Sequence, residues 1–229
     1  MKLIPKIIYQ SSDFLILNKP AGMLVHGARE GEEDLTSWLR ENYPEVKSVG
    51  DDPENRPGIV HRLDRETSGI IFVPRNQKTY EYFKNLFKSH QIEKKYIALV
   101  FGEVKDKQGI IEKPIGIKSG TVKRSVHSEK MRKEAITEYK VLKYLELKDK
   151  KFTLLEVTPR TGRTHQIRVH LAFIGHPIAG DKLYGGKRGL LEGLDRQFLH
   201  AKSLEFTAPD GKRLRFEAEL PEELKSLIK

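Results

Sequence analysis

Short apolar runs alternate with longer segments of helical periodicity along the 229-residue chain. The short runs are rich in β-branched and aromatic residues and are bounded by turn-forming residues, which is typical of strands. In the longer segments apolar residues recur every three or four positions, which predicts amphipathic helices. The predicted strands cover residues 6–9, 14–17, 70–73, 96–101, 138–147 and 152–157, and the predicted helices cover 34–43, 76 to about 91 and 164 to about 174.

Residues at the ends of the predicted helices agree with this pattern. Asp34 and Asn76 carry side-chain oxygens that can cap the first turns of the first two helices. Gly175, followed by Pro177, is expected to end the third helix. A charged turn at residues 148–151 joins two predicted strands into a hairpin.

Helices interspersed among hairpin-connected strands predict an α+β fold, with a mixed, largely antiparallel central β-sheet flanked by helices. The length suits one large domain, and the chain contains no internal repeat, low-complexity tract or Gly/Ser-rich linker. We therefore expect a single domain over residues 1–229.

The composition excludes several classes of site. The chain has no cysteine, which excludes a disulfide framework, a cysteine-based zinc site, a redox CxxC pair and a cysteine nucleophile. The N-terminus lacks the apolar stretch of a signal peptide, and no apolar run approaches the roughly 18 residues of a membrane span. We expect a cytoplasmic protein with no membrane partner.

Charge adds a candidate partner. The chain carries 42 Lys and Arg against 32 Asp and Glu, a formal net charge of +10, which suits either a polyanionic partner or solubility alone. Residues 118–133 hold six basic side chains against one acidic, and we expect them to form an irregular, mobile basic arm. Because half of the excess positive charge lies in this one segment, a nucleic-acid partner is favoured over solubility alone. The six are Lys118, Lys123, Arg124, Lys130, Arg132 and Lys133.

The first candidate site is the segment His61-Arg-Leu-Asp-Arg-Glu-Thr-Ser-Gly69, which precedes the predicted strand at 70–73. Arginines on both sides of Asp64 favour the charged form of its carboxylate, which suits a nucleophile or base that must stay ionised. A salt-bridged surface loop with no catalytic role explains the same residues. The segment by itself leaves both interpretations open.

The second candidate site is the segment 158–170, where basic and polar groups surround a Thr-Gly turn and the start of a helix. A helix N-terminus with arginines around it is a ready phosphate site, and Arg168 is expected to project from the helix flank toward a cleft. The alternative is an amphipathic surface helix with solvated arginines. The basic residues are Arg160, Arg163, His165, Arg168 and His170.

Tyr96 opens the predicted strand at 96–101, behind two lysines. It is either a core tyrosine with a satisfied hydroxyl or a platform on which a nucleobase stacks.

Several strings, in this order along the chain, resemble the motifs of the RluA-type pseudouridine synthases. The likeness runs from about residue 7 to about residue 220, and the HRLD string in register with Thr-Gly-Arg-x-His-Gln-Ile-Arg is highly specific. The strings are residues 18–26, 61–69, 95–96, 161–170 and 175–184.

This resemblance implies a pseudouridine synthase fold with an RNA-binding cleft, and an isomerase that converts specific uridines of rRNA or tRNA to pseudouridine without metal or cofactor. Asp64 corresponds to the family's essential aspartate, and Tyr96 to the tyrosine that stacks on the target base. Arg168 corresponds to the arginine that pairs with that aspartate. Arg62 matches the residue that enters the RNA stack in place of the flipped nucleotide, while residues 18–22 look structural.

Some features stay open. The sequence does not decide whether Asp64 attacks C1′, adds at C6 or abstracts the 2′ proton. The motifs begin within twenty residues of Met1, so we expect no N-terminal S4-like domain, and we expect a monomer. RNA selection would then rest on the catalytic domain, with Lys123, Arg124, Arg132 and Arg163 as candidate RNA-binding residues.

Two other classes of function compete with the enzyme. One is a catalytically silent RNA-binding module in which Asp64 only organises a loop. The other is a metal-dependent nuclease whose ligands would be His61, Asp64, His165 and His170. Arginines at positions 62, 65, 163 and 168 would repel a divalent ion, which disfavours the nuclease.

Overall fold

The computed structural model describes residues 3–29, 32–118, 120–121, 123–186 and 191–228. The chain divides into two compact units: unit 1 is Met1–Glu93 with Ala201–Pro221, and unit 2 is Lys94–His200 with Glu222–Lys229. The expectation of a single domain over residues 1–229 stays a prediction. None of the described helices is long and apolar enough to cross a membrane.

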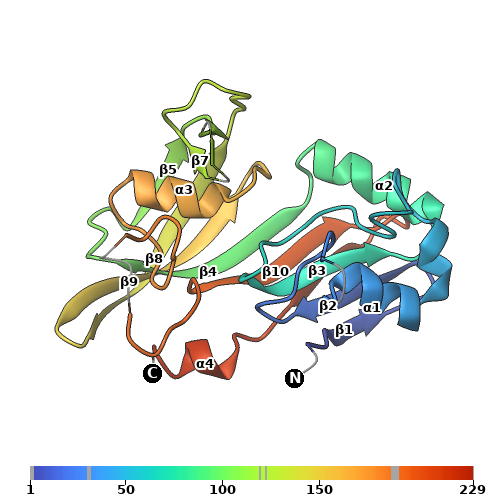
Figure 1. The fold of residues 1–229 in the computed structure, drawn as a ribbon, viewed down its shortest axis with the longest axis horizontal. Coiled ribbons are helices and arrows are strands. Elements are labelled where there is room, and N and C mark those ends of the chain that lie inside the picture. The colour runs from blue at the N-terminus through green and yellow to red at the C-terminus, as the bar shows by residue number, and fades with distance from the viewer. Residues whose placement is uncertain (1–2, 30–31, 119, 122, 187–190, 229) are drawn as a thin grey trace. The chain divides into compact units, whose positions relative to one another are not determined.

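The strands of unit 1 are β1 (Lys6–Gln10), β2 (Phe14–Lys19), β3 (Ser68–Pro74), the part of β10 (Leu199–Thr207) from Ala201 onward, and β11 (Arg213–Glu217) (Figure 1). Antiparallel pairs form between β1 and β2, β2 and β3, and β10 and β11. Every residue of β3 is buried, which explains the continuous apolar run in its sequence. The three strands predicted in this unit are confirmed, whereas β10 and β11 were not predicted.

The helices of unit 1 are α1 (Leu35–Asn42) and α2 (Gln77–Lys88), with a 3₁₀ turn, η1 (Pro44–Ser48), after α1. The predicted caps are confirmed: Asp34 accepts the N–H of Ser37, and Asn76 accepts the N–H of Thr79. Helix α2 ends at Lys88 rather than near residue 91. The chain there turns through a left-handed His90 with φ 58°, which stops the helix.

An aromatic cluster fixes α2 on the strands of unit 1. The ring of Phe83 on α2 lies 3.9 Å from Phe72 on β3 and 4.8 Å from Phe206 on β10, measured between ring centroids. Phe14 on β2 stacks on Phe72 at 5.0 Å. These contacts explain the apolar face that the periodicity of α2 predicted.

The strands of unit 2 are β4 (Glu93–Phe101), β5 (Gln108–Glu112), β8 (Ile136–Leu147) and β9 (Lys150–Pro159), and a separate small sheet holds β6 (Gly116–Ile117) and β7 (Arg124–Ser125). The main strands lie in the order β4-β9-β8-β5, and each neighbouring pair is antiparallel. The predicted hairpin of β8 and β9 is confirmed, but its turn has two residues rather than four. Lys148 and Asp149 both have positive φ, at 51° and 59°, as a tight hairpin turn requires.

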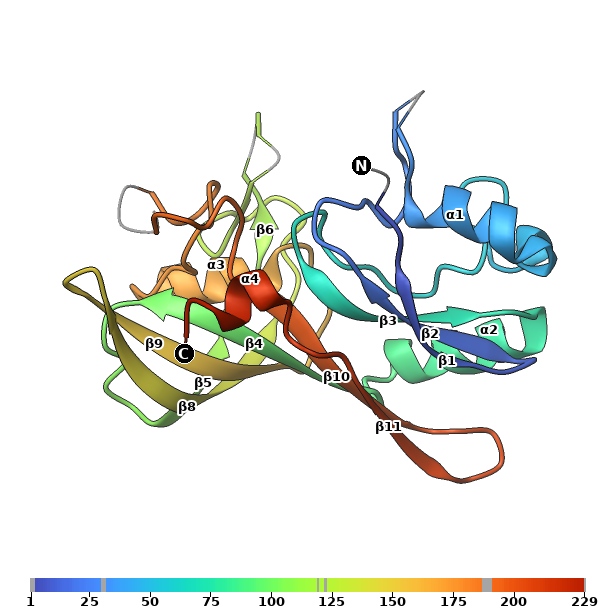
Figure 2. The same ribbon diagram turned by 90° about the horizontal axis from the view of Figure 1, so that it is seen from below.

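Two helices complete unit 2: α3 (Gln166–Phe173), which lies against β8 and β9 (Figure 2), and the short α4 (Glu222–Lys225). Helix α3 begins at Gln166 rather than at Thr164, because His165 takes a left-handed conformation with φ 57°. The α+β class with a mostly antiparallel sheet is thus confirmed in each unit.

Candidate active site

The four residues singled out for chemistry fall in two places in the chain's structure. Arg62 and Asp64 lie in unit 1, on the loop before β3, and Tyr96 and Arg168 lie in unit 2, on β4 and α3. The ion pair expected between Arg168 and Asp64 would join the two units, and it stays a prediction.

Asp64 sits on a short loop that is anchored on both sides. Leu63 before it is 5% exposed, and the N–H of Thr67 closes a turn on the carbonyl of Asp64 at 3.1 Å. Asp64 itself is half-buried, whereas Arg62 is exposed. The local structure therefore holds the backbone of the aspartate in place and leaves Arg62 at the surface.

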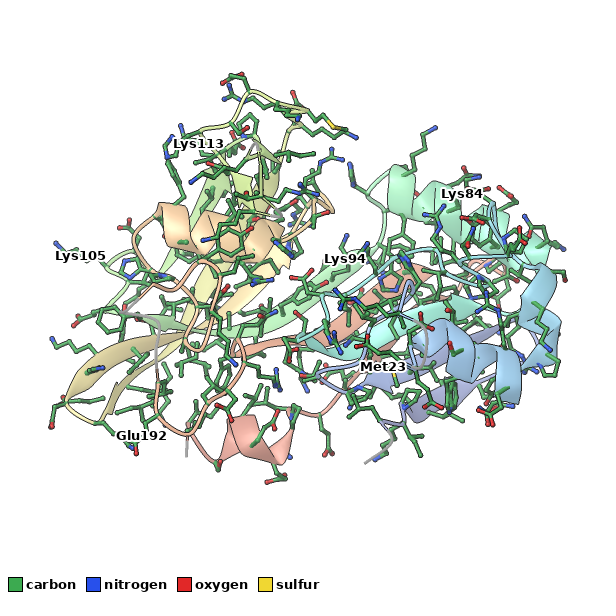
Figure 3. All side chains as sticks on the ribbon, viewed as in Figure 1. Met23, Lys84, Lys94, Lys105, Lys113 and Glu192 are labelled. Atoms are coloured by element: carbon green, nitrogen blue, oxygen red, sulfur yellow. The ribbon has the colours of Figure 1, made fainter. Side chains whose placement is uncertain are left out.

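A fully buried lysine ties this loop to the end of β2. The ammonium of Lys19 donates to the carbonyl oxygens of Pro20 and Met23, both at 2.8 Å, and to that of Arg65 at 3.1 Å. Met23 is labelled in Figure 3. Gly22 and Arg65 add two more bonds: the N–H of Gly22 donates to the carbonyl of Arg65 at 2.9 Å, and Nε of Arg65 donates to the carbonyl of Gly22 at 3.0 Å. The segment 18–22 thus acts as a clamp on the loop of Asp64.

The glycine that ends the HRLD string is required by the neighbouring strand. Gly69 has φ 115°, and a Cβ on it would lie 2.2 Å from the carbonyl oxygen of Ala201 on β10. No residue with a side chain fits there without moving one of the two strands. This close approach fixes the start of β3, and with it the end of the loop that bears Asp64.

His61 is part of the packing rather than of a reactive cluster. Its Nε2 accepts the N–H of Phe72 at 2.8 Å, and its ring stacks on Phe87 at a centroid distance of 4.5 Å. Within the described residues, His, Cys, Asp and Glu side chains form no group of three or more that could hold a metal ion.

Tyr96 is half-buried on β4, opposite Val157 of β9. Because side chains alternate along a strand, Lys94 points to the same side of β4 as Tyr96. Burial lowers the pKa of Lys94, whose side chain is labelled in Figure 3, from 10.5 to about 8. The predicted base-stacking tyrosine therefore has a lysine of unusually low pKa beside it.

Arg168 is held by a carboxylate that the sequence did not single out. Its Nε and Nη2 donate to the two oxygens of Asp181 at 2.8 and 3.0 Å, and both side chains are almost wholly buried. Burial acts to raise the pKa of Asp181, but the hydrogen bonds and charge of Arg168 outweigh it and lower that pKa. The guanidinium is thus fixed in one orientation within unit 2.

The polar face of α3 is buried, so the interpretation of α3 as a solvated surface helix is wrong. The side chain of Gln166 bonds with Thr161, with Thr137 and with the carbonyl of Ile136, at 2.7 to 3.0 Å. His170 lies between the hydroxyl of Thr137 at 2.9 Å and the carbonyl of Lys113 at 2.8 Å. Buried polar groups cost little when they are hydrogen-bonded, and these bonds fix α3 against β8.

The residues expected to contact RNA lie at or near the β6–β7 hairpin. The described part of 118–133 is more ordered than the predicted mobile arm, since Lys118 bonds to the carbonyl of Lys123 and Ile117 to that of Lys130. The side chain of Arg132 pairs with Glu129. Nε of Arg163 donates to the carbonyl of Glu134 at 2.8 Å. The full set of candidates is Lys123, Arg124, Arg132 and Arg163.

Sequence reasoning missed the residues that hold the candidate groups in place. Lys19 and Asp181 both lie in strings that were noticed, residues 18–26 and 175–184, but Lys19 was covered only by the expectation that residues 18–22 are structural, and Asp181 received no role. A charged residue inside each of these strings was the signal that the sequence offered, and the burial of both is visible only in the structure. Their partners, 46 and 13 residues away along the chain, are visible only in the fold.

Comparison with known proteins places these features in a family. A family model described as RNA pseudouridylate synthase matches residues 13–173. The chain is 37% identical to the uncharacterized RNA pseudouridine synthase YlyB of Bacillus subtilis (strain 168), over 97% of this chain and 71% of that protein. It is 34% identical to ribosomal large subunit pseudouridine synthase D of Yersinia pestis, over 97% of this chain and 69% of that protein.

Solved structures give the same result. The structure of human RNA pseudouridylate synthase domain containing 1 matches with a TM-score of 0.78 at 26% sequence identity, and the match covers 95% of this chain and 84% of that one.

Proposed function

The chain belongs to the RNA pseudouridylate synthase family and is an isomerase acting on RNA, and we propose that its substrates are specific uridines in ribosomal RNA of the large subunit. The name of the Yersinia pestis relative supports this choice of RNA. We further propose that the enzyme works in the cytoplasm as a monomer, and that it uses neither metal nor cofactor.

Base flipping is the first step that we propose. A stacked uridine does not present C1′ and C5 to a side chain, so the nucleotide must leave the stack at a cost of a few kcal/mol. Arg62, exposed on the loop before β3, enters the vacated space. Tyr96 receives the base on its ring. Both contacts offset the cost of extrusion.

Asp64 is the proposed catalytic residue. The N1–C1′ bond breaks with its electron pair on the base, the base turns, and C5 forms the new bond to C1′. The proton on C5 then leaves, and N1 gains one. Positive character develops at C1′ during cleavage, and the carboxylate of Asp64 stabilises it. Arg168 pairs with Asp64 and keeps its carboxylate ionised and aimed.

One observation carries this proposal: in each unit, the residue assigned to the chemistry is held by a buried polar anchor. Lys19 holds the loop of Asp64 through the carbonyl of Arg65, and Asp181 holds Arg168 through two hydrogen bonds. A loop that served only as a salt-bridged surface would not require a fully buried lysine beneath it. Such anchoring suits groups whose geometry must be preorganised.

RNA is expected to dock on the basic residues of unit 2. Lys123 and Arg124 lie on the β6–β7 hairpin, and Arg132 and Arg163 lie near it in the chain's fold. Each phosphate contact adds about 0.7–0.9 to the steepness with which log(kcat/KM) falls against log[salt]. The double variant Lys123→Gln with Arg132→Gln removes two such contacts and should therefore reduce this slope by about 1.4–1.8. An unchanged slope would remove these residues from the RNA contact set.

The activity is tested by incubating the purified protein with large-subunit rRNA and with tRNA, followed by chemical mapping of pseudouridine. Asp64→Asn is expected to bind RNA as the wild type does while product formation falls by at least about a thousandfold. Asp52→Asn, on a surface loop of the same unit, is the matched control and should leave the rate unchanged. Product on tRNA alone would overturn the choice of RNA.

The same assay separates the competing functions. A silent RNA-binding module makes no product with either RNA. A metal-dependent nuclease shortens the RNA and stops when EDTA is added, whereas the proposed isomerase leaves the RNA intact and continues in EDTA.

A further inference from the structure

Tyr184 contacts Arg168, Asp181 and the β6–β7 hairpin in unit 2. The N–H groups of Leu183 and Tyr184 donate to Oδ1 of Asp181 at 2.9 and 3.0 Å. The same carboxylate accepts two hydrogen bonds from Arg168. The turn that carries Tyr184 and the guanidinium are therefore fixed to one buried group.

The ring of Tyr184 covers the guanidinium. The central carbon of that group lies 5.1 Å from the centroid of the ring, which is within the range of a cation–π contact. Arg168 is thus confined by Asp181 at its edge and by Tyr184 at its face. A planar guanidinium held at edge and face has one orientation left.

The hydroxyl of Tyr184 reaches two other elements. It accepts the backbone N–H of Arg124 on β7 at 2.8 Å, and it lies 2.9 Å from Nδ1 of His165. His165 immediately precedes α3 and has a left-handed φ of 57°, a strained conformation for a residue with a side chain. One hydroxyl therefore joins the basic hairpin to the start of the helix that carries Arg168.

Apolar packing supports the same connection. Val126, just after β7, and Tyr184 both pack against a buried cluster that includes Val169, the neighbour of Arg168 on α3. Packing therefore connects the β6–β7 hairpin to α3 in addition to the hydroxyl, and closely packed groups transmit strain to one another.

We propose that Tyr184 is a positioning residue for Arg168, and that through its hydroxyl the docking of RNA on the β6–β7 hairpin stabilises the one orientation of the guanidinium that Asp181 and Tyr184 define. This inference rests on the proposed function, since it takes the hairpin to bind RNA and Arg168 to act on Asp64. It assigns the segment 175–184 a task in the reaction cycle: RNA bound at the hairpin favours the catalytic geometry.

The test is a double-mutant cycle on pseudouridine formation. Tyr184→Phe keeps the ring and removes only the hydroxyl, and we expect kcat at saturating RNA to fall about tenfold while KM changes less than about threefold. Tyr144→Phe is the matched control, because it likewise removes one tyrosine hydroxyl in the same unit, there one that donates to the carbonyl of Val104. That variant should keep the wild-type kcat.

The second arm of the cycle changes the hairpin. Lys123→Gln with Arg132→Gln should raise KM in both backgrounds, but lower kcat only when Tyr184 is intact. If Tyr184→Phe and the hairpin variant change kcat independently, so that their fold-effects multiply, the proposed coupling between the hairpin and Arg168 through Tyr184 is wrong. A purely structural role for Tyr184 would lower the melting temperature of Tyr184→Phe and leave this interaction on kcat absent.

The two levels of the argument fail in different ways. If the wild type forms no pseudouridine, the proposed function is wrong. If the wild type is active and Tyr184→Phe has the wild-type kcat, the enzyme assignment stands and only the coupling through Tyr184 is wrong.

Discussion

Replacing Lys19 by methionine tests whether the loop of Asp64 depends on a buried cation. The side chain of Lys19 is 0% exposed, and its ammonium donates to the carbonyls of Pro20, Met23 and Arg65. Methionine has nearly the same length and volume, so the change removes the donors without opening a large cavity.

The magnitude follows from the carbonyls left behind. The carbonyl of Arg65 still accepts the N–H of Gly22 at 2.9 Å, so the main loss falls on Pro20 and Met23. A buried acceptor without its donor costs about 1–3 kcal/mol, and we therefore expect a loss of about 3 kcal/mol. For a chain of this size each kcal/mol lowers Tm by about 2–4 °C, which gives a shift of about 6–12 °C.

Calorimetry and kinetics together test this expectation. Lys202→Met is the matched control, because Lys202 lies in the same unit and makes only a partly exposed pair with Glu217 at 3.0 Å. Such a pair is worth less than about 1 kcal/mol, so its Tm should move by no more than about 2–4 °C.

The rate is measured well below either melting temperature, where both variants are folded. Because Lys19 holds the carbonyl of Arg65, next to Asp64, we expect kcat of Lys19→Met to fall about tenfold, as a small misplacement of a catalytic group does. If Lys19→Met has the same Tm and kcat as Lys202→Met, the conclusion that Lys19 holds the loop of Asp64 is wrong.

Three further predictions follow from single positions. Gly69→Ala places a Cβ against Ala201 and should lower the free energy of unfolding by about 3 kcal/mol or more, as measured in denaturant. Gly162→Ala, with open space around it, should lower it by less than about 1 kcal/mol. Equal losses would contradict the close approach of Gly69 to Ala201. Burial lowers the pKa of Lys94 to about 8 from 10.5, so the unfolded chain binds more protons between these values and stability should rise over that pH range. In thermal melts, the Tm of Lys94→Met should lack that rise. If the Tm of the variant and that of the wild type change with pH in the same way, the pKa of Lys94 is not lowered. Burial also lowers the pKa of His170 below 6.5, so stability should fall as pH drops below 6.5, and more steeply than in His170→Gln; identical acid profiles would contradict a buried neutral histidine.

Local signals in the sequence were sufficient for much of the fold. The caps at Asp34 and Asn76 and the apolar runs of β2, β3 and β4 act over a few neighbouring residues, so their structure could be predicted without knowing any partner. The strands β5, β6, β7, β10 and β11 escaped prediction. Strands β5 and β11 alternate between exposed positions and partly or fully buried ones, and neither has the continuous apolar run that identified β3.

Motif strings likewise located the segments of the candidate site, and with them the family. Asp64 and Arg168 could be named from the sequence because the strings HRLD and HQIR are contiguous. The residues that surround Asp64 and Arg168 could not be predicted, and the interpretation of α3 as a helix with a solvated polar face was wrong. Whether that face is buried depends on Thr137 and Ile136 of β8, which are about 30 residues away in the sequence.

The sequence by itself determined many of the local elements, the family and the candidates for the residues that carry the reaction. Only the tertiary structure decided what holds those residues: Lys19 bonded to the loop of Asp64, Asp181 at the edge of Arg168, and Tyr184 at the face of Arg168 with its hydroxyl bonded to β7. The physical reason is separation along the chain. Lys19 and Arg65 are 46 residues apart, and Tyr184 and Arg124 are 60 apart. No periodicity records such a contact, which exists only once the chain has folded.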